Sequence, residues 1–419
     1  MSNPIKAIKG GTLIDGTGSE PLKKSVIIVE DSKIIEVGSE GKVSIPSGAE
    51  IIDAAKQIVM PGLIDCHTHL YSYASSNKAT GFGLIEWSNI DRAIRAVVTV
   101  KTFLGAGITS IRDVGCCANI DIAIRDAINA GFIPGPRVVA CGEGLTITGG
   151  HVDSDKHIRF AAFENIKIPK FKTIDGVTEV LKAVRQQIKL GADWIKFWAT
   201  GGVLEATERA HAQEFSDEEI NVLVGEASRA GVPVCVHALG ADTIKICIEA
   251  GVKSIEHGIF SDDESIQMMK NNDVYLVPTL IAYDLLSKDE NLPKATYEVA
   301  RGAIIAHEKT IKMAKKAGVK IAMGTDSGSP YTNIHGECQA WEMELMATRG
   351  LTEMESIVAT TKTAAECIGL GDKTGTIEPG KFADLIILDG DPLQDIKLFQ
   401  DKNKIKTVMK GGIVYVKRP

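Results

Sequence analysis

Short apolar runs rich in valine and isoleucine recur along the middle of this chain, each after a stretch with a helical pattern. The helical stretch ends in Ala-Gly or Gly-Ala, and the joined segments read LGAGITSIRDVG, LGADWIKFWATGG, RAGVPVCVHALG, EAGVKSIEHG and KAGVKIAMGTD. Glycine ends a helix well because it tolerates the left-handed cap conformation, and β-branched residues then favour a strand. With VMPGLIDCHTHL, GPRVVACGEGLTI and NDVYLVPTL, the pattern predicts eight strands.

Helical patterns between these strands predict the type of sheet. DEEINVLVGEASRA, for example, separates the fourth strand from the fifth. Strands that alternate with helices form parallel sheets, and eight such units close into a (β/α)8 TIM barrel. Long insertions follow the third strand (152–174) and the seventh strand (281–300), and we expect substrate-binding loops at both places.

The two ends of the chain carry another pattern, in which short alternating strands are separated by turns rich in glycine and aspartate. KGGTLIDGTG and SVIIVEDSKIIEVG lie near the start, and FADLIILDG and IKTVMKGGIVYV lie near the end. Neither end alone would bury enough apolar surface to be stable. We therefore expect an α/β fold in which residues 1–58 and 371–419 form one small β-sandwich and residues 59–370 form the barrel.

The composition of the chain indicates its domain sizes and excludes several kinds of partner. The chain has 419 residues, 44% of them apolar, which is enough for a large core and a smaller one. Its net charge of −7 argues against nucleic acid or an anionic membrane as a partner. No run approaches the ~18 apolar residues of a membrane span, and the first residues lack the apolar core of a signal peptide.

The eight cysteines include no CxxC pair and stand mostly in apolar surroundings. Such cysteines are typical of reduced, buried thiols in a reducing compartment. We therefore expect a cytoplasmic protein.

Histidines end the first predicted strand. His67 and His69 lie two apart in DCHTH, so both imidazoles face the same side of a strand, together with Asp65, while Cys66 and Thr68 face the other side. The C-terminal ends of barrel strands surround one active site, and histidine nitrogen is a ligand that suits zinc. The alternative is a pair of exposed histidines in a turn.

Lys196 is the most informative single residue, because WIKFW places it inside an apolar strand. Alternation puts Trp194, Lys196 and Trp198 on the inner face. Lysine is rarely buried without a partner, and a desolvated amine tends to be neutral. A neutral amine can take up carbon dioxide, and the resulting carbamate can bridge two metal ions. A lysine paired with an inner carboxylate, or a Schiff-base lysine, is the alternative.

Further candidate residues end later strands. His237 and His257 end strands five and six, and Asp326 ends strand eight, although an aspartate before Ser-Gly is also ordinary turn chemistry. His151 follows Gly-Gly after strand three, where glycine lets the backbone approach a ligand closely. Four other histidines lack such placement and are assigned no role: His157, His211, His307 and His335.

Several motifs resemble those of the metal-dependent amidohydrolase superfamily, over nearly the full chain. PGLIDCHTH and GTIEPGKFADLIILDGDPL resemble its two junctions between sandwich and barrel. TGGH, WIKFWATGGV, VHALGADTIKICIEAGVKSIEHG and GTDSG resemble the branch that contains imidazolonepropionase-related hydrolases and Xaa-Pro dipeptidases, or prolidases. The resemblance implies that His67 and His69 hold the more buried metal, that His237 and His257 hold the other, and that a carboxylated Lys196 bridges both.

The resemblance also implies roles in catalysis. Asp326 would complete the first metal and act as general acid and base, and His151 would polarise the scissile carbonyl. One position departs from the pattern: two residues after the strand-five histidine, dipeptidases of this branch tend to carry a polar side chain, and this chain has Leu239. The departure concerns the substrate and leaves the metal ligands unchanged.

Together these features predict a binuclear metal-dependent amidohydrolase with two divalent ions, for which zinc is the expected metal. A metal-bridged hydroxide would attack the amide bond of a dipeptide or an N-acyl amino acid; the alternative substrate is a cyclic amide, a urea or a carbamate. A non-catalytic scaffold would have lost ligands, and a mononuclear deaminase would not need the bridging lysine. We further expect a small-molecule substrate and a homo-oligomer, with no nucleic-acid or membrane partner.

Overall fold

Parallel strands form the central barrel of the computed structural model, which describes residues 5–71, 87–153, 171–203, 208–329 and 334–419. Seven of the eight predicted runs are strands in this described part of the chain: β7 (Leu63–Thr68), β8 (Ile108–Asp113), β9 (Arg137–Ala140), β12 (Ile195–Trp198), β13 (Val234–Gly240), β14 (Ser254–Phe260) and β15 (Tyr275–Val277). They pair in parallel within the orders β7-β8-β9 and β12-β13-β14-β15. The eighth run, residues 320–326, is extended chain with an isolated bridge between Leu276 and Ile321.

Backbone hydrogen bonds join these two groups of strands into a closed ring. On one side, the Ala322 amide donates to the Leu276 carbonyl at 2.9 Å and the Cys66 amide donates to the Met323 carbonyl at 2.9 Å. On the other side, the Asp193 amide donates to the Ala140 carbonyl at 2.7 Å and links β9 to the start of β12. The short strands β10 (Leu145–Thr146) and β11 (Lys172–Thr173) extend the sheet beside β12. The predicted (β/α)8 barrel is therefore confirmed.

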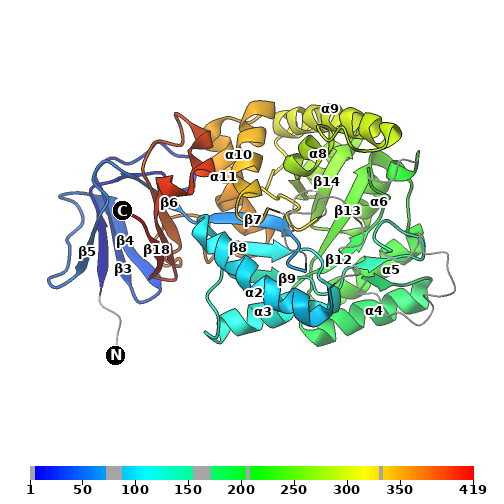
Figure 1. The fold of residues 1–419 in the computed structure, drawn as a ribbon, viewed down its shortest axis with the longest axis horizontal. Helices are drawn as coiled ribbons and strands as arrows, with labels where there is room; N and C mark the ends of the chain where they lie inside the picture. The colour runs from blue at the N-terminus through cyan, green and yellow to red at the C-terminus, as the bar shows by residue number, and fades with distance from the viewer. Residues whose placement is uncertain (1–4, 72–86, 154–170, 204–207, 330–333) are drawn as a thin grey trace.

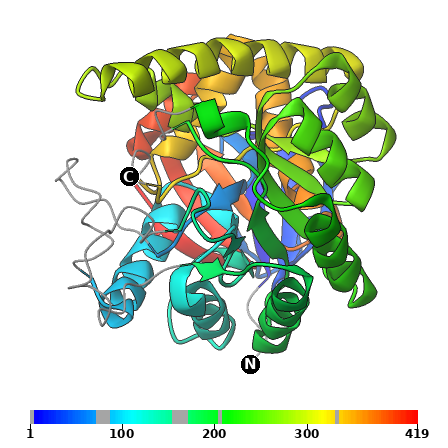
Figure 2. The ribbon, with the colours of Figure 1, turned by 90° about the vertical axis from the view of Figure 1, so that its right-hand side faces the viewer.

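Helices surround the strands (Figure 2). They are α2 (Asn89–Gly105), α3 (Ile120–Asn129), α4 (Val177–Leu190), α5 (Asp217–Arg229), α6 (Ala241–Ala250), α7 (Asp263–Asn271), α8 (Leu280–Leu286), α9 (Lys294–Ala317), α10 (Cys338–Arg349), α11 (Glu353–Thr360) and α12 (Lys362–Cys367). Three of the helices end at a glycine, as the sequence predicts. These C-terminal caps of α4, α6 and α9 are Gly191, Gly251 and Gly318, with φ of 94°, 103° and 75°. DEEINVLVGEASRA is α5, begun by a capping box between Ser216 and Glu219.

One predicted insertion has a different structure from the one expected. Residues 281–300 contain most of α8 and the start of α9 instead of a long loop. The helix α8 is stabilised because Glu342 accepts the amides of Leu280 and Ile281, at 2.9 and 2.7 Å, at its first turn. Of the other insertion (152–174), residues 154–170 lie outside the described residues.

Strands from both ends of the chain lie together at the left of Figure 1 and form two facing sheets. One has the order β4-β3-β1-β5 and the other β18-β17-β16-β6-β2, with β6 and β16 antiparallel. Their bounds are β1 (Lys6–Lys9), β2 (Thr12–Leu13), β3 (Ser25–Glu30), β4 (Lys33–Ser39), β5 (Glu50–Asp53), β6 (Ile58–Pro61), β16 (Leu385–Leu388), β17 (Ile405–Lys410) and β18 (Ile413–Lys417). The predicted β-sandwich is present, while the boundaries at 58/59 and 370/371 stay a prediction.

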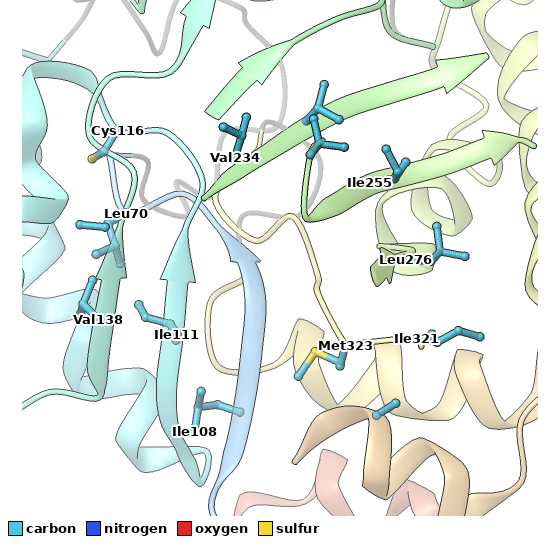
Figure 3. Close-up of a cluster of buried hydrophobic side chains, with 14 of the residues drawn as sticks. Leu70, Ile108, Ile111, Cys116, Val138, Val234, Ile255, Leu276, Ile321 and Met323 are labelled. Atoms are coloured by element: carbon cyan, nitrogen blue, oxygen red, sulfur yellow. The ribbon is translucent and has the colours of Figure 1, made fainter. Parts of the chain in front are cut away.

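Apolar side chains fill both parts of the molecule. The sandwich core joins residues from both ends of the chain, such as Ile8, Ile27 and Leu385. A larger cluster lies between the barrel strands and their helices, and Figure 3 shows part of it, including Ile111 and Ile255. All eight cysteines are free and buried, as their apolar surroundings predict. Among the described residues, no helix is both long and apolar enough to span a bilayer.

Candidate metal centre

Five histidine rings lie side by side across the C-terminal ends of the barrel strands. The ring centroids of His69 and His67 are 5.4 Å apart, and those of His67 and His257 are 5.0 Å apart. His237 follows at 4.5 Å from His257, and His151 stacks on His237 at 4.8 Å. The residues come from β7, β13, β14 and the segment after β10, so strands distant in the sequence bring the predicted histidines together.

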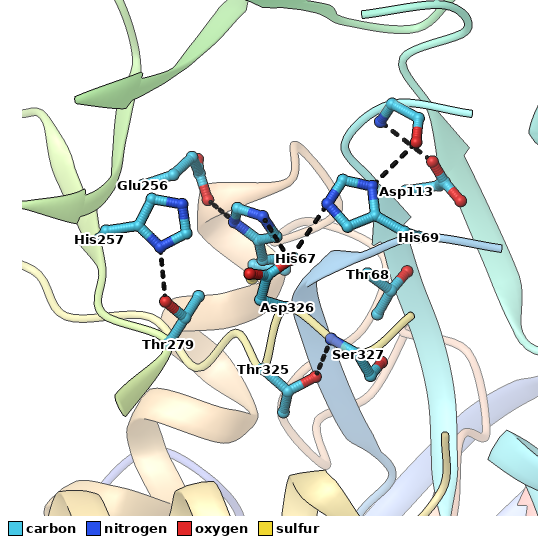
Figure 4. Close-up of polar contacts among 12 residues, drawn as sticks. His67, Thr68, His69, Asp113, Glu256, His257, Thr279, Thr325, Asp326 and Ser327 are labelled. Carbon is cyan, nitrogen blue, oxygen red and sulfur yellow. Dashed lines mark hydrogen bonds and ion pairs between the residues drawn. The ribbon is translucent and has the colours of Figure 1, made fainter. Parts of the chain in front are cut away.

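Asp326 joins this row of rings at the His67 end (Figure 4). Its Oδ1 atom lies 3.5 Å from Nε2 of His67 and 3.2 Å from Nε2 of His69. One donor atom from each of the three residues lies within 4.8 Å of the others, a grouping that could hold a metal ion. Burial alone would raise the pKa of Asp326, but the hydrogen bond from His69 and the electrostatic influence of His67 and Lys196 lower it below its usual range. The carboxylate is therefore ionised at neutral pH.

The imidazoles are in the protonation state that binds metals. Burial lowers the pKa of His67 to about 4, and it lowers the pKa values of His237 and His257 well below the usual range. Neighbouring histidines and Lys196 add to the effect, because each disfavours a positive charge beside it. All three rings are neutral at neutral pH, as a metal ligand requires.

Hydrogen bonds from outside the row orient three of these rings. Nδ1 of His69 donates to the Gly115 carbonyl at 2.9 Å, and Nδ1 of His257 lies 2.6 Å from Oγ1 of Thr279. His237 uses its other nitrogen, since Nε2 donates to the carbonyl of Gly201 at 3.0 Å. The other nitrogen of His69 faces Asp326, and an outer hydrogen bond that orients each ring is the usual arrangement around protein-bound metals.

Lys196 lies on β12, close enough to His67, His237 and His257 to lower their pKa values. Its side chain is 0% exposed, and Nζ has no hydrogen-bond partner among the described residues. Nζ lies 5.0 Å from the centroid of the Trp198 ring. Burial lowers the pKa of the amine. The alternative of an ion pair with an inner carboxylate is not seen among the described residues.

Sequence reasoning missed two residues beside the site. Glu256 Oε2 lies 2.8 Å from Nδ1 of His67, and Glu256 Oε1 accepts from Nη2 of Arg112 at 2.7 Å. Burial would raise the pKa of Glu256, but the Arg112 charge and the His67 hydrogen bond lower it to about 2. Neighbours on a regular strand face opposite sides, so strand alternation alone would not bring both Glu256 and His257 to the site. Both reach the centre because His257 has a φ of 71° and turns the chain.

Backbone strain is concentrated at this centre. His257, Thr279 and Asp326 adopt φ values of 71°, 54° and 56°, in the left-handed region that residues with a side chain rarely occupy. Each such residue costs about 1–3 kcal/mol and persists only where the surrounding structure holds it. The strain aims these three side chains at the row of rings.

The prediction for Asp65 is wrong. Its carboxylate does not face the two imidazoles: it accepts from the backbone amide of His67 at 3.0 Å, from the Thr325 hydroxyl at 2.6 Å and from Nε2 of Gln339 on α10 at 2.8 Å. The pairing of β7 with β8 shifts register between Asp65 and Thr68, so the simple alternation of faces is lost there. Two histidines assigned no role are buried nearby, and His335 Nε2 donates to the His69 carbonyl at 3.1 Å.

Comparison with known proteins adds an independent observation. The sequence profile of the Amidohydrolase family matches residues 58–414. Ochratoxinase of Aspergillus niger is 33% identical over 442 aligned positions, covering 98% of this chain and 86% of that protein. Imidazolonepropionase of Mesorhizobium japonicum is 29% identical, with 90% of each chain covered. A solved structure of a Xaa-Pro dipeptidase with methionine in its active site has a TM-score of 0.88 and 34% identity, covering 98% of this chain and 100% of that one.

Proposed function

Because this chain belongs to the amidohydrolase family and is a hydrolase of carbon–nitrogen bonds, we propose that it is a binuclear metal enzyme that cleaves an amide bond. The proposed substrate is a dipeptide or an N-acyl amino acid, which the similarity to a Xaa-Pro dipeptidase supports. One observation carries the proposal: the buried amine of Lys196, without a hydrogen-bond partner among the described residues, lies close enough to the imidazoles of His67, His237 and His257 to lower their pKa values.

The donor set fits two divalent ions. Imidazole nitrogen and carboxylate oxygen are ligands that suit zinc, and two ions need more donors than one. The proposed ligands are His67, His69, Lys196, His237, His257 and Asp326. His67, His69 and Asp326 would hold one ion, His237 and His257 the other, and Lys196 both.

Lys196 would take part as a carbamate. A neutral amine adds to carbon dioxide with loss of one proton, which forms an N–C bond and a carboxylate with two oxygens. Burial favours the neutral amine that this addition needs. Carboxylation would therefore turn the side chain of Lys196 into an anionic ligand beside the imidazoles. Bound metal would in turn stabilise the carbamate.

The catalytic roles follow from the two ends of the row of rings. When bound, the ions supply a water activated at neutral pH and a positive charge for the carbonyl oxygen. Asp326, ionised and adjacent to His67 and His69, would accept the proton of the attacking water and deliver it to the leaving nitrogen. His151, at the other end, would donate to the carbonyl oxygen as negative charge develops there.

A second candidate is hydrolysis of a cyclic amide, which one feature favours. Leu239, two residues after His237, is fully buried in an apolar cluster with Val203, Ile259 and Tyr283. No polar side chain therefore stands at that position to bind a substrate group. The similarity to an imidazolonepropionase supports the same alternative.

A substrate library distinguishes the two candidates. Protein produced with added zinc and bicarbonate is incubated with dipeptides, N-acyl amino acids, cyclic amides and ureas, and the released amine is measured. We expect turnover of dipeptides or N-acyl amino acids, loss of that turnover after a chelator removes the metal, and recovery with zinc. Turnover of cyclic amides alone would favour the second candidate, hydrolysis of a cyclic amide. Full turnover by metal-free protein would refute both candidate functions.

A further inference from the structure

A buried polar chain crosses the barrel interior from β8 to β7 through Glu256 on β14. Arg112, Glu256 and His67 have exposed fractions of 0%, 0% and 1%. Arg112 Nη2 donates to Glu256 Oε1 at 2.7 Å, and the Ser254 hydroxyl donates to the same oxygen at 2.6 Å. The other oxygen, Oε2, lies 2.8 Å from Nδ1 of His67 (Figure 4).

This chain determines which nitrogen of His67 carries the proton. Arginine stays charged in proteins and only donates, so the glutamate beside it is held as an ionised group that only accepts. Nδ1 of His67 must therefore be the donor, and in a neutral ring Nε2 then keeps its lone pair. Nε2 is the atom that lies 3.5 Å from Oδ1 of Asp326.

We propose that Glu256, held by Arg112 and Ser254, is a positioning residue that sets His67 in the tautomer whose Nε2 can bind a metal ion. The inference rests on the proposed metal centre. It adds that one proposed ligand, His67, depends on Glu256 for its orientation and tautomer. Glu256 touches neither substrate nor metal and acts only through His67.

The proposal predicts an unusual effect of Glu256→Gln. The amide has one accepting oxygen where the carboxylate had two, but it still faces donors on both sides. The charged Arg112 binds that oxygen more strongly, so the NH2 group turns to His67 and forces its Nδ1 to accept. The proton then moves to Nε2 and blocks that ligand atom. We expect metal to bind about 10–100-fold more weakly. This is the usual effect of losing a residue that hydrogen-bonds a metal ligand without touching the metal itself.

Removing the arginine as well should restore binding. In Arg112→Met/Glu256→Gln the amide can rotate, so its oxygen accepts from Nδ1 of His67 and its NH2 group faces the Ser254 hydroxyl. We expect metal affinity within about tenfold of the parent, because the outer partner is regained. Arg112→Met/Glu256→Leu is the matched control: it is equally uncharged and loses the same arginine contacts, but it offers His67 no acceptor.

Metal affinity is measured by chelator competition with zinc for the parent and these three variants, and thermal unfolding of the metal-free forms reports stability separately. The proposal expects Arg112→Met/Glu256→Gln to bind zinc more tightly than both Glu256→Gln and Arg112→Met/Glu256→Leu. Equal affinity of the two double variants, whatever their stability, would overturn it. Neither double variant leaves a buried charge unpaired, so the comparison survives if Glu256→Gln does not fold.

A measurement on the unaltered protein completes the test. In metal-free parent protein with 15N-labelled histidine, NMR reports which ring nitrogen of His67 carries the proton, with His67→Asn used to assign the signal. The proposal expects the proton on Nδ1, and a proton on Nε2 would overturn it. A parent that fails to bind two ions would instead contradict the proposed function, whereas two bound ions with equal double variants would contradict only this inference.

Discussion

Lys196→Ala is expected to lose bound metal and amide hydrolysis together, with turnover falling to the background rate. The amine is the only proposed ligand able to join both ions, and the alanine side chain removes the bridge without adding a charge. Lys196→Arg is expected to fail as well, because a guanidinium stays charged and cannot take up carbon dioxide. Elemental analysis and a hydrolysis assay on the same preparations measure both effects.

Two controls make this result specific. A short carboxylic acid such as acetate can occupy the space left in Lys196→Ala and is expected to restore part of the metal and part of the activity. Lys410→Ala removes a half-buried lysine of the sandwich strand β17, whose Nζ donates to the Gly135 carbonyl at 2.6 Å, and this variant should retain both ions. Two ions and parental turnover in Lys196→Ala would refute the bridging role.

Asp326→Asn is expected to separate catalysis from metal binding. The amide keeps the shape of the side chain and one carbonyl oxygen for the metal, but it loses the basicity that accepts a proton. We expect most metal to remain while kcat falls by roughly 10²–10⁴, the usual contribution of general acid–base catalysis. Metal content is measured beside kcat and kcat/KM.

Asp65→Asn is the matched control for this variant. Asp65 is a buried carboxylate of the neighbouring strand, but it faces Thr325 and Gln339 and not the row of rings. Its loss should lower thermal stability and leave kcat within about tenfold of the parent, well above the range expected for Asp326→Asn. Parental kcat in Asp326→Asn would show that another group moves the proton.

The sequence predicted those features that depend on regular repetition. Glycine after an apolar helix gives a cap and then a strand, so residues such as Gly251 mark where each barrel unit restarts. The C-terminal ends of parallel strands converge, so His237 and His257 could be expected to meet although 20 positions separate them. The buried amine of Lys196 could be expected because an apolar strand surrounds it.

What the sequence could not predict depends on irregular backbone. A register shift in β7 turns Asp65 away from the histidines it should accompany. The positive φ of His257 brings Glu256 to the centre although it is the adjacent residue. A periodic sequence pattern does not predict such local turns. Tertiary contacts stabilise them against the conformational free energy that the unfavourable backbone angles cost. A glutamate inside the apolar strand SIEHG was the only signal available.

The number of metal ions per chain tests the binuclear centre most directly. Protein purified from cells grown with added zinc and bicarbonate is analysed for metal, and stripped protein is titrated with zinc while hydrolysis is followed. We expect about two ions per chain, since the donors exceed what a single four-coordinate ion needs, and full activity only after the second equivalent. One ion at saturation with full activity would contradict the binuclear centre.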